Sequence, residues 1–267
     1  MRAITEAEFG RFQHFIFDQA GITLSSAKQA LVSGRLAKRL AQHGHESYGE
    51  YYQLLASGQD PDEVQMAVDL LTTNETYFFR ELKHFEFLRQ QALAARGRGQ
   101  PYRVWSAASS IGEEAFSIAM VLADCLESAR WEVLGTDISS QVLAHAARGL
   151  YTMARARHVP PDYLRRYCRK GEGDYDGHLL IEPGLRQRVR FAQVNLNEPL
   201  PDLGQFDMVF LRNVMIYFSD STKRGVVSRV VSTLKRGGHF CVGHSETLNN
   251  LTDAVEPVVA SIYRRPA

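Results

Sequence analysis

The sequence has 267 residues, of which 45% are hydrophobic and 23% are charged. These fractions exclude disordered and fibrous classes, and the length allows one main domain with a smaller one beside it. Thirty-one basic and thirty acidic residues give a net charge of +1. No global field therefore attracts nucleic acid or an anionic membrane, and we expect no nucleic-acid partner.

The cysteine pattern and the lack of long apolar runs restrict the cellular context. The three cysteines, Cys125, Cys168 and Cys241, are far apart and form no Cys-x-x-Cys pair. Disulfides and structural zinc are therefore not expected, and no metal site is predicted. The first residues lack the apolar core of a signal peptide, and no stretch of about 18 apolar residues occurs. We expect a cytoplasmic protein that does not insert into a membrane.

Residues 1–75 are predicted to form a small helical domain. Apolar residues recur there at spacings of three and four, which is typical of four short helices. Gly21 marks a helix end, and Pro61 suits a first helical turn. Ser47 followed by Glu50 has the pattern of a capping box.

The remaining residues, 76–267, are predicted to form a doubly wound α/β domain. After a predicted helix at 81–95, short apolar runs alternate with helical segments. These runs are YRVWS (102–106), WEVLGT (131–136), VRFAQV (189–194), FDMVFL (206–211), HFCVG (239–243) and VVASIY (258–263). Near-continuous apolar strands between helices indicate a mainly parallel sheet that is covered on both faces.

A polar segment at about 163–190 interrupts this alternation. It contains the sequence GEGDYDG, with glycines at 171, 173 and 177. Such a glycine-rich stretch is typical of a loop between two antiparallel strands. We therefore expect an inserted hairpin or small subdomain here.

Two segments that follow predicted strands contain candidate ligand-binding residues. In an open α/β sheet, ligands bind beyond the carboxyl ends of the strands. The first strand is followed by SAASSIGEE (106–114), a turn of small residues before a helix that begins near Glu113. The second strand ends at Asp137, at roughly the spacing where nucleotide-binding folds place an acid on ribose hydroxyls. A plain tight turn and a helix-capping Asp are the structural alternatives.

The later strands add polar residues at the same edge of the sheet. Asn195 and Leu196 follow the third run, and Arg212, Asn213 and Tyr217 follow the fourth. A dinucleotide would need the G-x-G-x-x-G pattern, of which a single glycine is present. S-adenosylmethionine has no phosphate, and it needs an acid for its ribose, space for adenine and partners for its amino-acid part. These loops can provide all three.

The segment TNETYFFRE (73–81) precedes the sheet and is also a candidate site. It places Asn74, Thr76 and Arg80 beside two phenylalanines. A purely structural segment would seldom need these polar groups together. The structural alternative is a helix cap followed by a buried pair of phenylalanines.

Five segments in this order resemble the CheR family of chemotaxis protein-glutamate methyltransferases. They are TNETYFFRE, VWSAASSIGEEAFSIAM, GTDIS, FDMVFLRNVMIYF and LKRGGHFCVGHSETL, and the similarity runs over nearly the whole chain. The resemblance implies an all-helical N-terminal domain and a class I S-adenosylmethionine-dependent methyltransferase domain with a Rossmann-like sheet and an inserted antiparallel β-subdomain. It also implies methyl transfer to glutamate side chains of methyl-accepting chemoreceptors, with S-adenosylhomocysteine as the product and sensory adaptation as the role.

The resemblance also assigns roles to residues at matching motif positions. The implied cofactor-binding set is Asn74, Thr76, Arg80, Glu113, Glu114, Asp137, Asn195, Leu196, Arg212 and Asn213. A helix turns about 100° per residue, so one of the two glutamates is expected to face the cofactor. Arg80 and Tyr217 are predicted to position the reacting groups. No strong base is required, because a glutamate substrate is already ionised at pH 7.

Two surfaces are candidate contacts for the receptor. Arg35, Lys38 and Arg39, together with Lys28, are predicted to form a basic stripe on the second helix. Chemoreceptor methylation helices are rich in glutamate, so this stripe would complement the receptor's cytoplasmic helical bundle, although a solvated helix face explains it equally. In the family, the β-subdomain can bind a peptide from the receptor's C-terminus at its sheet edge, which makes such a peptide a second candidate partner.

Three other functions have less support in the sequence. A methyltransferase of DNA bases usually carries Asp/Asn-Pro-Pro-Tyr after the fourth strand, where this chain has RNVMIYF. A dehydrogenase would need the missing glycines. The alternative that stays open is a regulatory adaptor that binds S-adenosylmethionine or S-adenosylhomocysteine without methyl transfer, although the intact TNETYFFRE segment favours activity.

Overall fold

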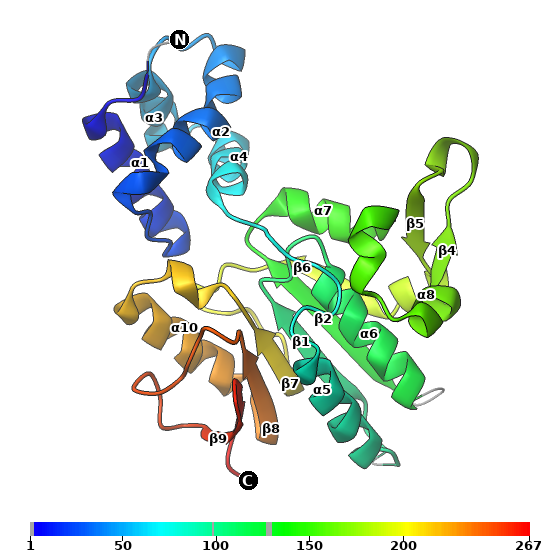
Figure 1. The fold of residues 1–267 in the computed structure, drawn as a ribbon. Helices are drawn as coiled ribbons and strands as arrows, with labels where there is room; N and C mark the ends of the chain where they lie inside the picture. The colour runs from blue at the N-terminus through cyan, green and yellow to red at the C-terminus, as the bar shows by residue number, and fades with distance from the viewer. Residues whose placement is uncertain (1–2, 98, 127–129) are drawn as a thin grey trace.

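The computed structural model describes residues 3–97, 99–126 and 130–267. A helical bundle at the N-terminal end lies against an α/β domain that carries a small second sheet (Figure 1). The α-helices of the bundle are α1 (Glu6–Ala20), α2 (Gln29–Gln42), α3 (Tyr48–Ser57) and α4 (Pro61–Leu71), with the 3₁₀ helix η1 (Ser26–Lys28) before α2. The four short helices predicted from the apolar spacing are confirmed.

Capping bonds differ in one detail from the prediction. The Ser47 hydroxyl caps α3 by accepting a hydrogen bond from the Glu50 amide at 3.2 Å. The Glu50 carboxylate, however, accepts from the Glu46 amide at 2.8 Å, so the predicted capping box is only half formed. The reciprocal pair is found at the start of α1, between Thr5 and Glu8.

Seven strands of the described residues form the main sheet. Their spatial order is β6 (Val189–Gln193), β2 (Trp131–Asp137), β1 (Tyr102–Ala107), β7 (Phe206–Leu211), β8 (Leu234–Val242), β10 (Ile262–Arg264) and β9 (Glu256–Val259). The first five strands in this order, from β6 through β2, β1 and β7 to β8, pair in parallel. Strand β10 pairs antiparallel with both β8 and β9. The predicted mainly parallel sheet is confirmed. The strand order changes direction between β1 and β7, which is where an open α/β sheet has its ligand crevice.

The prediction of a single strand at 258–263 is wrong. The segment is part of a hairpin, in which β9 ends at Val259 and β10 begins at Ile262. The chain reverses over Ala260 and Ser261, and Ser261 has a left-handed φ of 62°. No glycine or asparagine marks this turn, so the apolar run reads as continuous.

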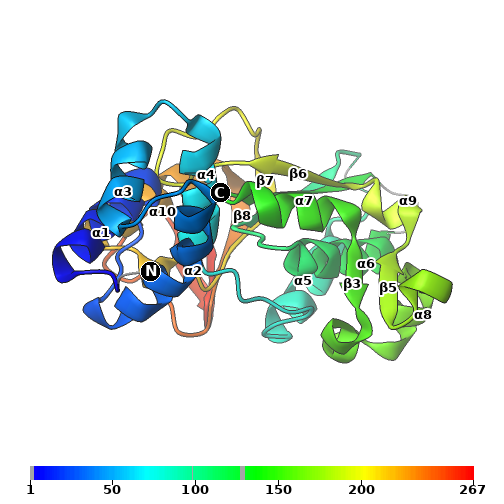
Figure 2. The same cartoon turned by 90° about the horizontal axis from the view of Figure 1, so that it is seen from above.

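Helices cover both faces of the sheet, as predicted (Figures 1 and 2). Helices α5 (Lys83–Ala94) and α6 (Glu113–Leu126) pack on one face, and α10 (Asp220–Ser232) packs on the other. Helix α7 (Ser140–Arg148) lies between β2 and β6 in the chain. None of the helices in the described part of the chain is long and apolar enough to cross a bilayer.

The second sheet is small and antiparallel. Its strands are β3 (Leu150–Thr152), β5 (His178–Ile181) and β4 (Cys168–Lys170), in that spatial order. The short helices around it are η2 (Met153–His158), α8 (Pro161–Tyr167), η3 (Gly173–Tyr175) and α9 (Pro183–Arg186). The predicted antiparallel subdomain is confirmed, but its sheet begins before the predicted range 163–190, and Val189 already belongs to β6. A strand of three residues such as β3 is too short to show a period of two.

Polar contacts hold the bundle against the α/β domain. The Asp69 carboxylate on α4 accepts hydrogen bonds from the Ser140 amide and hydroxyl, at 3.0 and 2.8 Å, and from the Gln141 amide at 3.3 Å. These donors lie at the N-terminus of α7, where the helix dipole favours a carboxylate. Ile22 also forms an isolated antiparallel bridge with Phe218. The bundle is therefore fixed directly beside the carboxyl ends of the parallel strands.

Candidate active site

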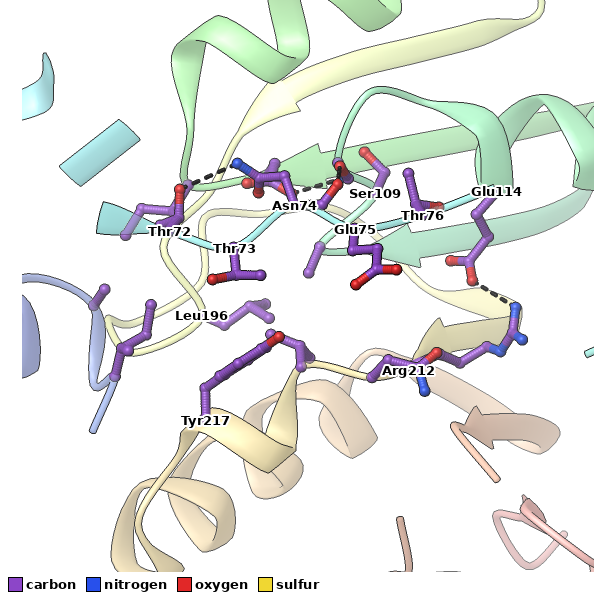
Figure 3. Close-up of a pocket in the computed structure, with 18 of the residues that line it drawn as sticks. Thr72, Thr73, Asn74, Glu75, Thr76, Ser109, Glu114, Leu196, Arg212 and Tyr217 are labelled. Carbon is purple, nitrogen blue, oxygen red and sulfur yellow. Dashed lines mark hydrogen bonds and ion pairs between the residues drawn. The ribbon is translucent and has the colours of Figure 1, made fainter. Parts of the chain in front are cut away.

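A cavity lies where the loops after β1, β2, β6 and β7 meet the linker that follows α4 (Figure 3). It contains about 920 Å³ of empty space, part of which is open to solvent. Ten of the eleven predicted cofactor-binding and catalytic residues line it, namely Asn74, Thr76, Arg80, Glu114, Asp137, Asn195, Leu196, Arg212, Asn213 and Tyr217. The exception is Glu113.

Part of the cavity wall was not predicted. Ala20 and Ile22, at the end of α1, line the cavity, as do Glu75 of the linker and Ile138 after β2. The α1 residues are small or apolar, and nothing in their local pattern distinguishes them from core residues. Glu75 was visible inside TNETYFFRE, and its charge beside three other polar residues is the signal that could have found it.

Asp137 is the most buried carboxylate on the cavity wall, with 6% of its surface exposed. Its two oxygens accept hydrogen bonds from the Ser110 amide at 2.8 Å and the Ser139 amide at 3.0 Å. Burial raises the pKa of Asp137, and these amide hydrogen bonds act in the opposite direction. Each carboxylate oxygen keeps a further lone pair, so the group can accept two hydrogen bonds from a vicinal diol.

The turn after β1 has an unusual backbone. Ala108 and Ser110 line the cavity with positive φ values of 61° and 51°, and Asn213 across the cavity has a φ of 59°. Such conformations are strained in non-glycine residues, and they cluster at functional sites. Gly112 has a different role, because a Cβ there would lie 2.8 Å from the Ala146 Cβ. Its lack of a side chain therefore serves the packing of the turn against α7.

The two glutamates at the start of α6 have different surroundings. Glu113 is fully buried, and its carboxylate accepts hydrogen bonds from Arg155 Nε at 2.6 Å and Nη2 at 2.8 Å. Glu114 lines the cavity and accepts a hydrogen bond from Ser106 Oγ at 2.6 Å. It also accepts one from Arg212 Nη1 at 2.8 Å (Figure 3). The predicted cofactor contact therefore keeps a geometric basis for Glu114 only, because both oxygens of Glu113 are engaged by Arg155 outside the cavity.

Arg212 ties together three segments of the site. Only 1% of its side chain is exposed, and its guanidinium pairs with Glu114 at 2.8 Å and Glu81 at 2.9 Å. It also donates to the carbonyl oxygen of Arg80. Burial alone would lower the pKa of Arg212, but Glu114 and Glu81 raise it, so the group stays charged. Its position between α6, β7 and the linker gives it a positioning role.

The linker residues run along one side of the cavity. The Asn74 carbonyl oxygen accepts a hydrogen bond from Ser110 Oγ at 2.9 Å, and its side-chain amide donates to Thr72 Oγ1 at 3.3 Å. The Thr76 carbonyl oxygen accepts from Arg155 at 2.8 Å. Arg80 donates to the Glu75 carbonyl oxygen at 3.2 Å, and no acidic side chain pairs with it among the described residues. Its charge is therefore available to a bound anion.

The segments after β6 and β7 form the opposite side. The Asn195 side-chain amide donates to the Gln19 carbonyl oxygen in α1 at 2.7 Å, so this residue also joins the two domains. Leu196 is buried and gives the cavity an apolar wall. Figure 3 shows Tyr217 across the cavity from the linker residues. The sequence-predicted residues of both sides thus face one cavity.

The residues of the predicted basic stripe do not share one environment. Lys38 is exposed on α2, whereas Lys28 belongs to η1 and not to the second helix as predicted. Arg35 is half-buried and donates to the carbonyl oxygens of Thr72 at 2.8 Å and Leu71 at 3.3 Å. Burial lowers the pKa of Arg35, and an interaction with Tyr217 of the cavity opposes this shift.

Arg39 is committed to a buried ion pair. Its Nε donates to Glu63 Oε1 at 2.9 Å, and Glu63 is 3% exposed. The Tyr51 hydroxyl donates to the same carboxylate at 2.5 Å. This network links α2, α3 and α4, so Arg39 has a structural role in the bundle whatever else it contacts.

Comparisons with known proteins agree with this fold. Residues 74–264 match the family model described as CheR methyltransferase, SAM binding domain. Residues 7–72 match the model described as CheR methyltransferase, all-alpha domain. The change from one model to the other falls in the linker that follows α4.

Curated relatives are similar over almost their whole length. The chain is 41% identical to proteins named chemotaxis protein methyltransferase from Salmonella typhimurium and Escherichia coli, over 93% of this chain and 86% and 87% of theirs. It is also 41% identical to chemotaxis protein methyltransferase 1 of Pseudomonas aeruginosa, over 97% of both chains. The chain therefore belongs to the CheR methyltransferase family and is an S-adenosylmethionine-dependent methyltransferase.

Proposed function

We propose that this protein transfers the methyl group of S-adenosylmethionine to glutamate side chains of methyl-accepting chemoreceptors. The products are glutamate methyl esters and S-adenosylhomocysteine, and the reaction takes place in the cytoplasm. The observation that carries the proposal is the buried Asp137 carboxylate on a cavity at the strand ends of a chain of this family. The relatives named chemotaxis protein methyltransferases support the receptor as substrate.

The cavity offers each contact that the cofactor needs. Asp137 has acceptors for the two ribose hydroxyls. Ile138 and Leu196 provide apolar surface for adenine. Glu114 carries a negative charge that complements the cofactor's ammonium group, and Arg80 carries a positive charge that can meet either the cofactor's carboxylate or that of the substrate. We assign the remaining predicted residues on this wall, which are Asn74, Thr76, Asn195, Arg212 and Asn213, to the same pocket.

The residues of the chain need only hold the substrate carboxylate in place. Bound S-adenosylmethionine supplies an electrophilic methyl group on a positively charged sulfur. A substrate glutamate is ionised at pH 7, because its usual pKa is about 4.3, so no residue has to remove a proton. Holding a reacting pair in line contributes about 7–11 kcal/mol to catalysis. We propose that Arg80 and Tyr217 do this, since they carry a free cation and a phenol at the cavity.

The proposal is tested by titrating S-adenosylmethionine and S-adenosylhomocysteine into the wild-type protein and Asp137→Ala by calorimetry. We expect both ligands to bind the wild type and neither to bind the variant, because the ribose loses its acceptors. The matched control is Asp207→Ala, which removes an acid of β7, two strands away from β2, whose carboxylate pairs with Lys235 outside the cavity. Equal binding by all three proteins would contradict the site.

A methyl-transfer assay separates the enzyme from the regulatory adaptor. We expect the wild-type protein to transfer a labelled methyl group to receptor fragments that carry glutamate-rich helices. Tight cofactor binding without transfer to any such fragment would instead support the adaptor.

We further propose that the bundle docks on the receptor's cytoplasmic helices through Arg35 and Lys38. Arg35 donates to the carbonyl oxygen of Thr72, which lines the cavity, and the exposed Lys38 follows three residues later on the same helix. Lys38→Glu should raise the receptor KM and leave the melting temperature unchanged. Arg39→Glu is the contrasting variant, because it breaks the pair with Glu63 and should lower the melting temperature. An unchanged KM in Lys38→Glu would favour a solvated helix face.

A second contact is proposed at the small sheet. Its outer strands, β3 and β4, each pair with β5 alone, so each has one free edge within the described chain. A receptor C-terminal peptide could add a strand there, which would raise the local substrate concentration. Calorimetric titration of that peptide into the protein tests this, and no detectable binding would count against the tether.

A further inference from the structure

Three potential metal ligands meet beside the cavity, on the far side of Arg212. Glu81, His84 and His244 each offer one ligand atom, and these atoms lie within 4.8 Å of one another. Glu81 Oε2 is 3.5 Å from His84 Nδ1 and 3.9 Å from His244 Nε2. Within the described part of the chain, no second group of three such residues is present. The cluster joins the start of α5 to the segment after β8.

His84 is the member that a purely structural account leaves unexplained. It is 1% exposed, and neither of its ring nitrogens has a hydrogen-bond partner among the described residues. Burying a polar group without a partner costs about 1–3 kcal/mol. Glu81 Oε2 lies 3.5 Å from His84 Nδ1 without forming a hydrogen bond, and His244 offers a ring nitrogen within 4.8 Å. The buried imidazole therefore faces two other ligand atoms with its own coordination unsatisfied.

We propose that Glu81, His84 and His244 bind a divalent transition-metal ion, with Zn²⁺ as the best match. Imidazole and carboxylate are common zinc ligands, and three protein ligands leave a fourth position for water. With metal–ligand bonds of about 2.0–2.1 Å, neighbouring ligand atoms in a tetrahedral site are about 3.3–3.4 Å apart. The observed separations of 3.5 and 3.9 Å are close to this value, and the third pair, His84 and His244, lies within 4.8 Å. His244 is 52% exposed, which provides a path for entry.

Glu81 connects this metal site to the cavity. Its Oε2 also accepts a hydrogen bond from Arg212 at 2.9 Å, so the metal and the guanidinium compete for one oxygen. Arg212 and Asn213 both line the cavity, and Asn213 contacts the other oxygen of Glu81 at 3.4 Å. Bound metal should therefore loosen Arg212 and weaken cofactor binding. This second step rests on the proposed function, whereas metal binding itself does not.

Co²⁺ is the probe for the site, because its visible absorption reports the coordination number. The full-length chain, freed of any affinity tag and treated with a chelator, is titrated with Co²⁺ and, by calorimetry, with Zn²⁺. We expect one equivalent to bind, with the absorption of a four- or five-coordinate ion. His244→Gln should weaken binding at least about tenfold, since even outer-shell changes at metal sites have effects of that size. His14→Gln removes an exposed histidine of α1 and should bind as the wild type does.

The outcomes separate the two steps. Unchanged Co²⁺ affinity in His244→Gln, or no binding by the wild type, would overturn the metal site. His244 is half exposed, so we expect this variant to fold, and circular dichroism is the control that checks it. Cofactor titration with and without Zn²⁺ then tests the coupling, and we expect weaker binding with Zn²⁺ in the wild type but not in His244→Gln. If the metal-free wild type bound no cofactor, the proposed function would fail while the Co²⁺ result would stand.

Discussion

Glu113 and Glu114 are adjacent in sequence, but their carboxylates belong to different parts of the molecule. Glu113 pairs with Arg155 of η2, and Glu114 pairs with Arg212 at the cavity. The sequence indicated that one of the two faces the cavity, because successive helical residues point about 100° apart. It could not indicate which one, since the choice depends on where Arg155 and Arg212 lie in the fold.

This contrast gives a matched pair of variants. Glu114→Gln should raise the Kd of S-adenosylmethionine about tenfold, which is about 1.4 kcal/mol, because a charge at the cavity and the partner of Arg212 are lost. Glu113→Gln should leave that Kd within about twofold and lower the free energy of unfolding by about 1–3 kcal/mol, because a charged hydrogen bond to Arg155 is weakened. Calorimetry and urea denaturation measure the two quantities. Equal shifts of Kd in both variants would contradict the assignment.

Single residues differ in how well the sequence could identify them. Asp137 was identifiable because it ends an apolar strand at the edge where ligands bind. The Glu81, His84 and His244 cluster was not, because His244 is 163 positions from Glu81 and only the fold brings them together. The expectation of no metal site rested on the spacing of ligand residues along the sequence, which does not reveal clusters that form only in the fold.

At the scale of elements, the central strands were predictable because both of their faces are buried. β7 occupies the predicted residues 206–211, since its whole apolar run lies inside the sheet. The C-terminal run 258–263 was predicted wrongly because β9 is an exposed edge strand whose apolar side chains reach solvent. Apolar character alone did not distinguish a strand from a hairpin with Ala-Ser at its turn.

The helices of the bundle are held together by a network that should depend on pH. Burial alone would raise the pKa of Glu63, but hydrogen bonds from Arg39, Tyr51 and His43 lower it below its usual value. A carboxyl group whose pKa is lower in the folded state stabilises the fold above its unfolded pKa. This stabilisation is lost as the pH falls through the folded value, when Glu63 is protonated.

Glu63→Gln tests this network. At pH 7 we expect the variant to lose about 1.5–3 kcal/mol of unfolding free energy, the range for hydrogen bonds to charged groups. Toward pH 3, below the usual pKa of a glutamate, the wild type begins to lose this contribution, so the difference between the two proteins should shrink. Urea denaturation at both pH values measures it. The control is Glu50→Gln, whose exposed carboxylate accepts from the Glu46 amide at the start of α3 and should matter little at either pH. A constant difference across pH would rule out the titration of Glu63.

At the scale of the whole molecule, the bundle and the α/β domain share one apolar core. A single cluster of buried side chains runs from Phe12 and Leu36 of the bundle to Val227 of α10 and Phe240 of β8. Asp69 and Asn195 add polar contacts across the same junction. The sequence predicted two domains in order, but it could not predict this junction, because helix periodicity shows which face is apolar and not what covers it. That is why Ala20 and Ile22 were missed as cavity residues.

A shared core has a thermodynamic consequence. If burial in the bundle depends on the α/β domain, the two parts should unfold together, and scanning calorimetry should show one transition with equal calorimetric and van't Hoff enthalpies. S-adenosylmethionine should shift the whole transition upward, because it binds only the folded state and its cavity has walls from both parts. Asp69→Ala should lower the transition temperature without splitting it, since the apolar cluster remains. Two transitions in the wild type, with only one of them responding to the cofactor, would instead show that the bundle folds independently and only borders the site.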